Sequence, residues 1–131
     1  MPIEYDIIVD KQLVLAKGSG VITGSDVIRH LEALAKDDRY KAPMKKLVDY
    51  RTVDSIRITS EEAYQIAQKK KKLDNVFIGE RCAFVSPADA TYGSSRVHQA
   101  LLYGSGIKTD IFRRMEDALK WLDVTLDVSH E

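Results

Sequence analysis

Charged and hydroxyl side chains end or follow three predicted strands, which cover residues 47–50, 81–85 and 107–112. These side chains are Asp49, Arg51, Ser86, Tyr92, Arg96 and Arg113. Because the carboxyl ends of parallel strands meet at one edge of an open α/β sheet, that edge is where such a sheet binds ligands. Tyr92 and Arg96 are four residues apart on a predicted helix and therefore share a face. The pattern predicts a site for a small anion, held by Arg51 and Arg96.

The same residues also fit a purely architectural role, and that interpretation is favoured. Asp89 would cap the helix that follows Pro87, and Asp49 would form an ion pair with an arginine. Charge networks at strand ends are often structural. The sequence leaves both interpretations open.

The residue types that would mark an enzyme are not arranged for catalysis. The chain has no nucleophile elbow and no zinc-protease motif, and His30, His98 and His130 lie far apart in the sequence. Cys82 is the only cysteine, which excludes an internal disulfide, and its place in a predicted central strand favours a core role. We therefore expect no enzyme activity, no metal site and no cofactor.

Two further motifs resemble ligand sites but fit structural roles better. Residues 18–24 read Gly-Ser-Gly-Val-Ile-Thr-Gly, and the strand-like Val21-Ile22 within them favours a β-bulge over a nucleotide-binding loop. The run Lys69–Lys72 covers a whole helical turn, so its side chains cannot all face one way. It has no interleaved aromatic residues, and it therefore predicts a solvated helix end.

The composition indicates one ordinary globular domain. The chain has 131 residues, of which 20 are Lys or Arg and 20 are Asp or Glu, and 44% are hydrophobic. A net charge of zero argues against a protein that coats nucleic acid or an anionic membrane. No segment approaches the roughly 18 apolar residues of a membrane span. We expect a cytoplasmic protein with no nucleic-acid partner and no transmembrane segment.

The elements that must position these side chains follow the order β-β-α-β-α-β-α-β-α. Residues 3–9 and 13–16 predict a hairpin across a polar turn. Apolar periodicity predicts four helices, over residues 23–36, 59–73, 87–104 and 115–122. The strand at residues 47–50 is expected to lead into a loop that ends at Thr59, where Thr59 and Glu62 predict a capping box. The order implies an α/β domain with a mixed sheet, in which an antiparallel hairpin precedes parallel strands.

Four segments carry a resemblance to a known family. They are Leu47–Arg51, Ala83–Pro87, Tyr92–Arg96 and Ile111–Leu122. Together they resemble the SpoIIAA-like group of small bacterial STAS-type domains, and the last segment is the most specific. The resemblance implies four or five strands with helices on the sheet. We assign residues 1–123 to one STAS-like domain and expect residues 124–131 to form a frayed tail.

The resemblance implies a non-enzymatic module that binds a protein partner through the surface around residues 51–60. Better-known STAS domains, the anti-sigma-factor antagonists, are switched by phosphorylation of a serine in an Asp-Ser-Ser-Gly turn that opens a helix. The nearest counterpart here lacks the second serine and the glycine, and its candidate partner or phosphorylation residues are Ser55, Thr59 and Ser60. Glu61 and Glu62 would repel a phosphate at Ser60.

The alternative function is binding of a small anionic or lipid-like molecule. The group is likened in fold to CRAL-TRIO domains, which hold an apolar ligand between the sheet and the helices. Here Arg51, Tyr92, Arg96 and Arg113 would hold the anionic group. A chain of this length has room for only a small pocket. A homodimer is a further option, because the leading hairpin leaves an edge strand exposed.

Overall fold

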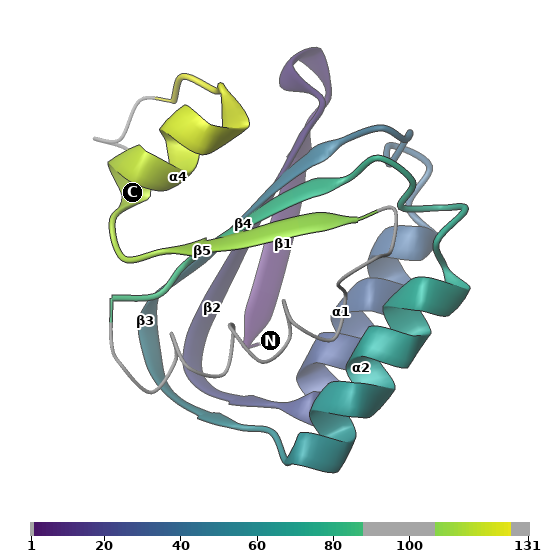
Figure 1. Cartoon of the computed structure of the whole chain (residues 1–131), viewed down its shortest axis with the longest axis vertical. Coiled ribbons are helices and arrows are strands. Elements are labelled where there is room, and N and C mark those ends of the chain that lie inside the picture. Colours follow the sequence, from purple (N-terminus) through teal and green to yellow (C-terminus); the bar gives the residue numbers. More distant parts are fainter. Residues whose placement is uncertain (1, 88–106, 127–131) are drawn as a thin grey trace.

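The computed structural model describes residues 2–87 and 107–126, and that part of the chain forms a five-stranded sheet flanked by helices (Figure 1). The strands lie in sequence order: β1 Ile3–Ile8, β2 Leu13–Thr23, β3 Lys45–Arg57, β4 Arg81–Val85 and β5 Lys108–Phe112. The described helices are α1 Gly24–Ala35, α2 Ser60–Lys72 and α4 Met115–Leu122, with a 3-10 turn, η1, at Val9–Lys11. The predicted helix at 87–104 lies outside the described residues.

The mixed sheet is confirmed. Strands β1 and β2 form the antiparallel hairpin, and the pairs β2–β3, β3–β4 and β4–β5 are parallel. The glycine-rich stretch is part of β2, and the register between β2 and β3 shifts at Lys17/Ser19 and again at Gly20/Val21. Gly20 has a φ of 66°, which suits glycine. The stretch is therefore the bulged strand that the sequence predicted.

Both helices that follow β2 and β3 begin with a capping box. The Thr59 hydroxyl accepts a hydrogen bond from the Glu62 N–H at 3.1 Å, and the Glu62 carboxylate accepts one from the Thr59 N–H at 2.9 Å. Thr23 and Asp26 make the same reciprocal pair at the start of α1. These bonds satisfy backbone donors that a helix start would otherwise leave without partners.

The helices lie on opposite faces of the sheet. Neighbouring residues on a strand point to opposite faces, and β2 shows this directly. Val14 packs in a cluster with α1 and α2, whereas Leu13 packs with Leu119 and Leu122 of α4. Figure 1 shows α1 and α2 side by side, with α4 apart from them. The sheet is thus covered on both faces, and its α1/α2 face continues through a third cluster that includes the buried Cys82.

Strand β3 is longer than predicted, and this corrects the expected loop. The sequence placed a strand at residues 47–50, but β3 runs to Arg57. Its second half pairs with β2 from Ser19↔Thr52 to Thr23↔Arg57. The residues there are mostly polar because this half has no β4 beside it, so its sequence resembles that of a loop.

The chain end beyond α4 is only partly described. Of the predicted tail at 124–131, Val124 and Leu126 pack against the α4-face cluster, and residues 127–131 lie outside the described part. Among the helices of the described ranges, none is long and apolar enough to cross a membrane.

Candidate functional site

The structure brings three of the predicted ligand-binding residues to one edge of the sheet. Asp49 pairs in register with Val85, and Val85 pairs with Phe112. Ser86 and Arg113 directly follow those two strand ends, so they lie beside Asp49 at that edge. Tyr92 and Arg96, the other half of the predicted anion site, lie outside the described residues.

Asp49 and Arg51 form an ion pair at this edge. The Arg51 Nε donates to Asp49 Oδ1 at 3.0 Å, and the other carboxylate oxygen accepts from the guanidinium at 2.9 Å. The Arg51 backbone N–H also donates to this carboxylate. Burial would raise the pKa of Asp49, but these hydrogen bonds outweigh it and hold the pKa below its usual value. This geometry matches the structural interpretation.

Ser86 and Arg113 make different contacts at the same edge. Ser86 is fully buried, and its N–H donates to the Phe112 carbonyl at 2.8 Å. Its hydroxyl has no hydrogen-bond partner in residues 2–87 and 107–126. Arg113 is exposed and donates to the Pro87 carbonyl at 3.0 Å. The edge therefore holds one buried hydroxyl, and the described contacts of Arg51 and Arg113 are made within the protein.

The candidate phosphorylation residues occupy two different kinds of position. Ser55 is half-buried within β3 and pairs in register with Val21, so it does not lie in a turn that opens a helix. Thr59 is the N-cap of α2, and its hydroxyl accepts the Glu62 N–H. Ser60 is exposed at the first residue of α2.

A cluster of buried polar groups lies on the α1/α2 face of the sheet, and the sequence analysis missed it. The Lys70 ammonium lies 3.1 Å from Glu80 Oε1, and the Tyr40 hydroxyl donates to Glu80 Oε2 at 2.6 Å. All three side chains are buried. We call Lys70, Glu80 and Tyr40 the interior triad. Lys70 corrects the prediction that the lysine run is solvated, because its side chain is only 2% exposed.

A second buried lysine joins this cluster from the sheet. Lys46 of β3 is 3% exposed and pairs in register with Cys82, which pairs with Thr109 of β5. In the described ranges no carboxylate is ion-paired with Lys46. Burial, and then the nearby Lys70 ammonium, lower the pKa of Lys46 to about 8. The buried cluster thus holds two lysines and one carboxylate, a formal excess of one positive charge when both lysines are protonated.

The pKa shifts of the interior triad show a tightly coupled pair. Burial opposes both charged forms, but the Glu80 carboxylate raises the pKa of Lys70, and the two lysines lower that of Glu80. Burial and the Glu80 carboxylate raise the pKa of Tyr40, which keeps its hydroxyl protonated as a donor. Lys70 and Glu80 are therefore both charged at neutral pH.

His30 of α1 lines a small pocket near the cluster. Its side chain is buried and packs edge-on against the Tyr5 ring, with the ring centroids 5.4 Å apart. Within the part of the chain that the structure describes, neither ring nitrogen has a hydrogen-bond partner. Burial, and then the ammonium groups of Lys46 and Lys70, lower the pKa of His30 to about 2, so the ring is neutral. The pocket has a volume of about 70 Å³.

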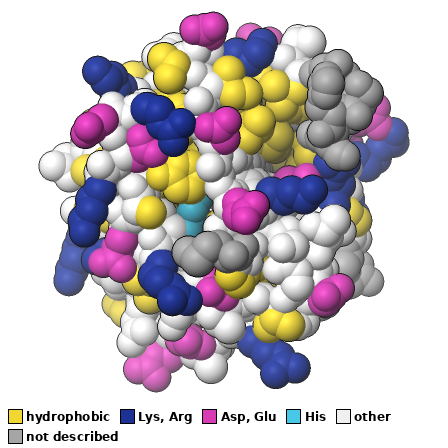
Figure 2. All heavy atoms as spheres, turned by 180° about the vertical axis from the view of Figure 1, so that it is seen from behind, with side chains coloured by type: hydrophobic (Ala, Val, Ile, Leu, Met, Phe, Trp, Pro, Cys, Tyr) yellow, Lys and Arg dark blue, Asp and Glu magenta, His cyan; other side chains and the backbone are white. Residues whose placement is uncertain are grey.

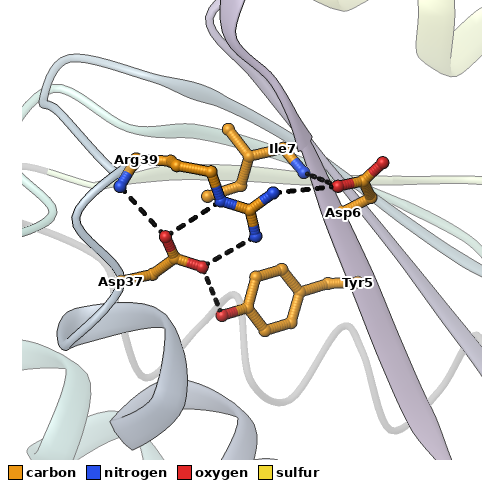
Figure 3. Close-up of polar contacts among 5 residues, drawn as sticks. All are labelled: Tyr5, Asp6, Ile7, Asp37 and Arg39. Atoms are coloured by element: carbon orange, nitrogen blue, oxygen red, sulfur yellow. Dashed lines mark hydrogen bonds and ion pairs between the residues drawn. The ribbon is translucent and has the colours of Figure 1, made fainter.

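A surface group resembles the interior triad in composition. Figure 3 shows Asp37 between Arg39 and Tyr5, and we call these three residues the surface triad. The Tyr5 hydroxyl donates to Asp37 Oδ2 at 2.8 Å, and the Arg39 guanidinium donates to both carboxylate oxygens, at 3.1 and 2.9 Å. Arg39 also pairs with Asp6 of β1 at 3.1 Å. The triad links β1 to the segment after α1.

The comparisons with known proteins identify the fold. No protein-family model and no curated protein matches the sequence. Among solved structures, the chain is similar to an uncharacterized DUF3478-family protein with a SpoIIAA-like fold from Shewanella loihica PV-4. The match covers 92% of this chain and 93% of that chain, with a TM-score of 0.59 and 21% identity. The resemblance to the SpoIIAA-like group is therefore confirmed for the fold: the chain is a single α/β domain with a SpoIIAA-like fold.

Proposed function

We propose that this chain is a non-enzymatic, cytoplasmic STAS-like module that binds a protein partner along the outer half of β3 and the start of α2. The observation that supports it is the uneven length of the strands. Strand β4 reaches only to Val85, opposite Asp49, whereas β3 continues to Arg57. In the described part of the chain, the β3 residues from Thr52 to Arg57 have a pairing register with β2 alone. An open strand edge offers backbone donors and acceptors to an extended segment of another protein.

The side chains around this edge suit a protein partner. Asp54 and Arg57 are exposed on β3 and provide charges of both signs. Val21, in the neighbouring strand, is 41% exposed, and Tyr64, in the second turn of α2, is 54% exposed. Tyrosine is enriched in protein interfaces, and their rims are polar. Ser60 is the phosphorylation candidate of this surface, because the Thr59 hydroxyl is used by the cap and Ser55 lies within a strand.

The test is a paired capture experiment with purified protein as bait. We expect the chain to recover a partner that the double variant Asp54→Lys, Arg57→Glu no longer binds. Glu4→Lys is the matched control, because Glu4 is exposed on β1, an edge strand that β2 separates from β3. With the recovered partner purified, hydrogen exchange should show new protection of amides in residues 50–57. Protection elsewhere, or equal binding by the double variant, would refute the proposed surface.

A charge change at Ser60 tests whether this surface can be regulated. Ser60→Asp places a negative charge at the first residue of α2, beside Glu61 and Glu62. If the partner contacts the start of α2, Ser60→Asp should change its Kd severalfold and Ser60→Ala should not. Equal affinity for both variants would remove Ser60 from the interface.

A further inference from the structure

A small pocket lies between the start of β1 and α1. Its walls include the apolar side chains of Pro2, Ile3 and Ala33, and its polar groups include Arg29 and His30. Figure 2 shows the histidine surface, in cyan, recessed below hydrophobic side chains and close to an acidic one. The volume of about 70 Å³ is roughly half that of a cavity that binds benzene, so the pocket suits a group of only a few heavy atoms.

His30 supplies the hydrogen-bonding chemistry of this pocket. The side chain is about nine-tenths buried, and neither ring nitrogen has a hydrogen-bond partner among the described residues. A neutral imidazole carries one N–H donor and one acceptor nitrogen. A buried polar group of this kind indicates a ligand or another polar occupant, because an unmade hydrogen bond costs free energy.

The charges around His30 determine the sign of that occupant. On α1, Arg29 and Asp26 also line the pocket and pair with each other at 3.0 Å, so their charges cancel. The Asp26 carboxylate is further held by the Thr23 N–H and hydroxyl. On β1, the Tyr5 hydroxyl is neutral and bound to Asp37.

Behind the imidazole, the interior cluster leaves one positive charge in excess. Glu80 pairs with Lys70, and Lys46 has no ion-pair partner in the described ranges. Both ammonium groups act on His30, because they contribute to the fall in its pKa. The net potential at the buried imidazole is therefore positive, and it favours a singly charged anion.

We infer that this pocket binds a small monocarboxylate, whose oxygen accepts a hydrogen bond from the His30 imidazole and whose charge is balanced by the buried Lys46. The apolar wall contacts the carbon end of the ligand. A dianion such as phosphate would exceed the single uncompensated charge. This site is separate from the β3 surface proposed for a protein partner.

The test uses sodium acetate as the probe and acetamide as its neutral control, at constant ionic strength. Ring signals of His30, assigned by their loss in His30→Gln, are followed by NMR. We expect acetate to shift them along a saturable curve and acetamide to leave them unchanged. A linear shift without saturation, or the same shift with acetamide, would overturn the inference.

Two variants test separately the contributions of the Lys46 charge and of the pocket volume. Lys46→Met removes the buried cation while keeping an apolar side chain of similar length, and it should weaken acetate binding about tenfold. Ala33→Phe fills the pocket from the exposed side of α1, leaves every charge in place, and should abolish the shift. Lys41→Met, at an exposed lysine, is the control and should bind acetate as the wild type does. Unchanged binding in both Lys46→Met and Ala33→Phe would refute the site.

Discussion

The interior triad and the surface triad combine the same kinds of chemical group, one inside the protein and the other at its surface. Each joins a carboxylate to a cation and to a tyrosine hydroxyl, at hydrogen-bonding or ion-pairing distance. The carboxylate of the interior triad is fully buried, whereas that of the surface triad, Asp37, is 14% exposed and its partner Arg39 is 47% exposed. The comparison isolates the effect of burial on one arrangement of groups.

Burial changes how much each interaction contributes to the free energy of unfolding. On the surface, water screens the charges and solvates whichever group loses its partner, so such pairs contribute little. In the interior, a charge that loses its partner keeps its desolvation cost. We therefore regard the interior triad as necessary for the packing of α2 on the sheet, and the surface triad as a local link between β1 and the segment after α1.

The largest expected effect is the loss of the interior carboxylate. Glu80→Gln would leave the ammonium groups of Lys70 and Lys46 facing each other without a counter-charge. We expect the free energy of unfolding to fall by about 3–5 kcal/mol, measured by urea denaturation at pH 7. Glu61→Gln, at an exposed residue, is the control and should leave it nearly unchanged. A loss of less than about 1 kcal/mol for Glu80→Gln would contradict the importance of the triad.

Substitution of Lys46 should raise the free energy of unfolding, whereas Glu80→Gln lowers it. It is a buried cation without an ion-pair partner in the described residues, so Lys46→Met removes a desolvation cost. We expect a gain of about 2 kcal/mol in the free energy of unfolding at pH 7 in acetate-free buffer. A loss of stability would show that Lys46 is charge-balanced in the folded protein.

The pH dependence of this gain follows from the lowered pKa of Lys46. Between about pH 8 and 10.5, the unfolded chain keeps the Lys46 proton that the folded chain has lost. The contribution of Lys46 to the free energy of unfolding of the wild type therefore rises with pH in this window. Lys46→Met has no such rise, and its advantage should shrink across that window. Measuring the difference between the two proteins cancels the contributions of groups that do not interact with Lys46. Burial raises the pKa of the neighbouring Cys82, which opposes the rise in stability above about pH 9. A constant difference from pH 7 to 10.5 would contradict the shifted pKa.

Local sequence signals predicted most of the fold. The hairpin, the Thr59 capping box and the α4 stripe depend on residues close together in the chain, and all are present. The extent of β3 was missed, because its second half is stabilised by pairing with β2 and its exposed polar residues resemble a loop. Strand length there is set by a partner about thirty residues earlier, which local propensity does not report.

The interior cluster was missed for two different reasons. Lys70 is four residues after Ile66 and three after Ala67, so helical spacing already placed it on the buried stripe. The general rarity of buried lysine masked that signal. Glu80 carries no local signal at all, because it precedes β4 and its partners, Lys70 and Tyr40, come from other segments. Such a pair becomes visible only when the chain is folded.

Removing the tyrosine hydroxyl from each triad should give the next smaller loss of stability, and it compares the two triads most directly. Tyr40→Phe removes a hydrogen bond to the buried Glu80 carboxylate and should cost about 1.5 kcal/mol. Tyr5→Phe removes the corresponding bond to Asp37, where water can replace the hydroxyl, and should cost clearly less. Urea denaturation of both variants under one condition measures the difference. Equal losses would mean that burial does not distinguish the two triads.

The smallest effect is expected for the surface cation. Arg39→Gln removes the ion pairs with Asp37 and Asp6, but the exposed guanidinium is screened by solvent. Unfolding followed at low salt should show a slight loss of stability, and the same comparison in about 0.5 M NaCl should show none, because salt at that strength shortens the range of charge interactions. Glu80→Gln should lose nearly the same stability at both salt concentrations, since its charges lie out of reach of mobile ions. A salt-independent loss in Arg39→Gln would mean that the surface triad acts through packing of the arginine side chain rather than through its charge.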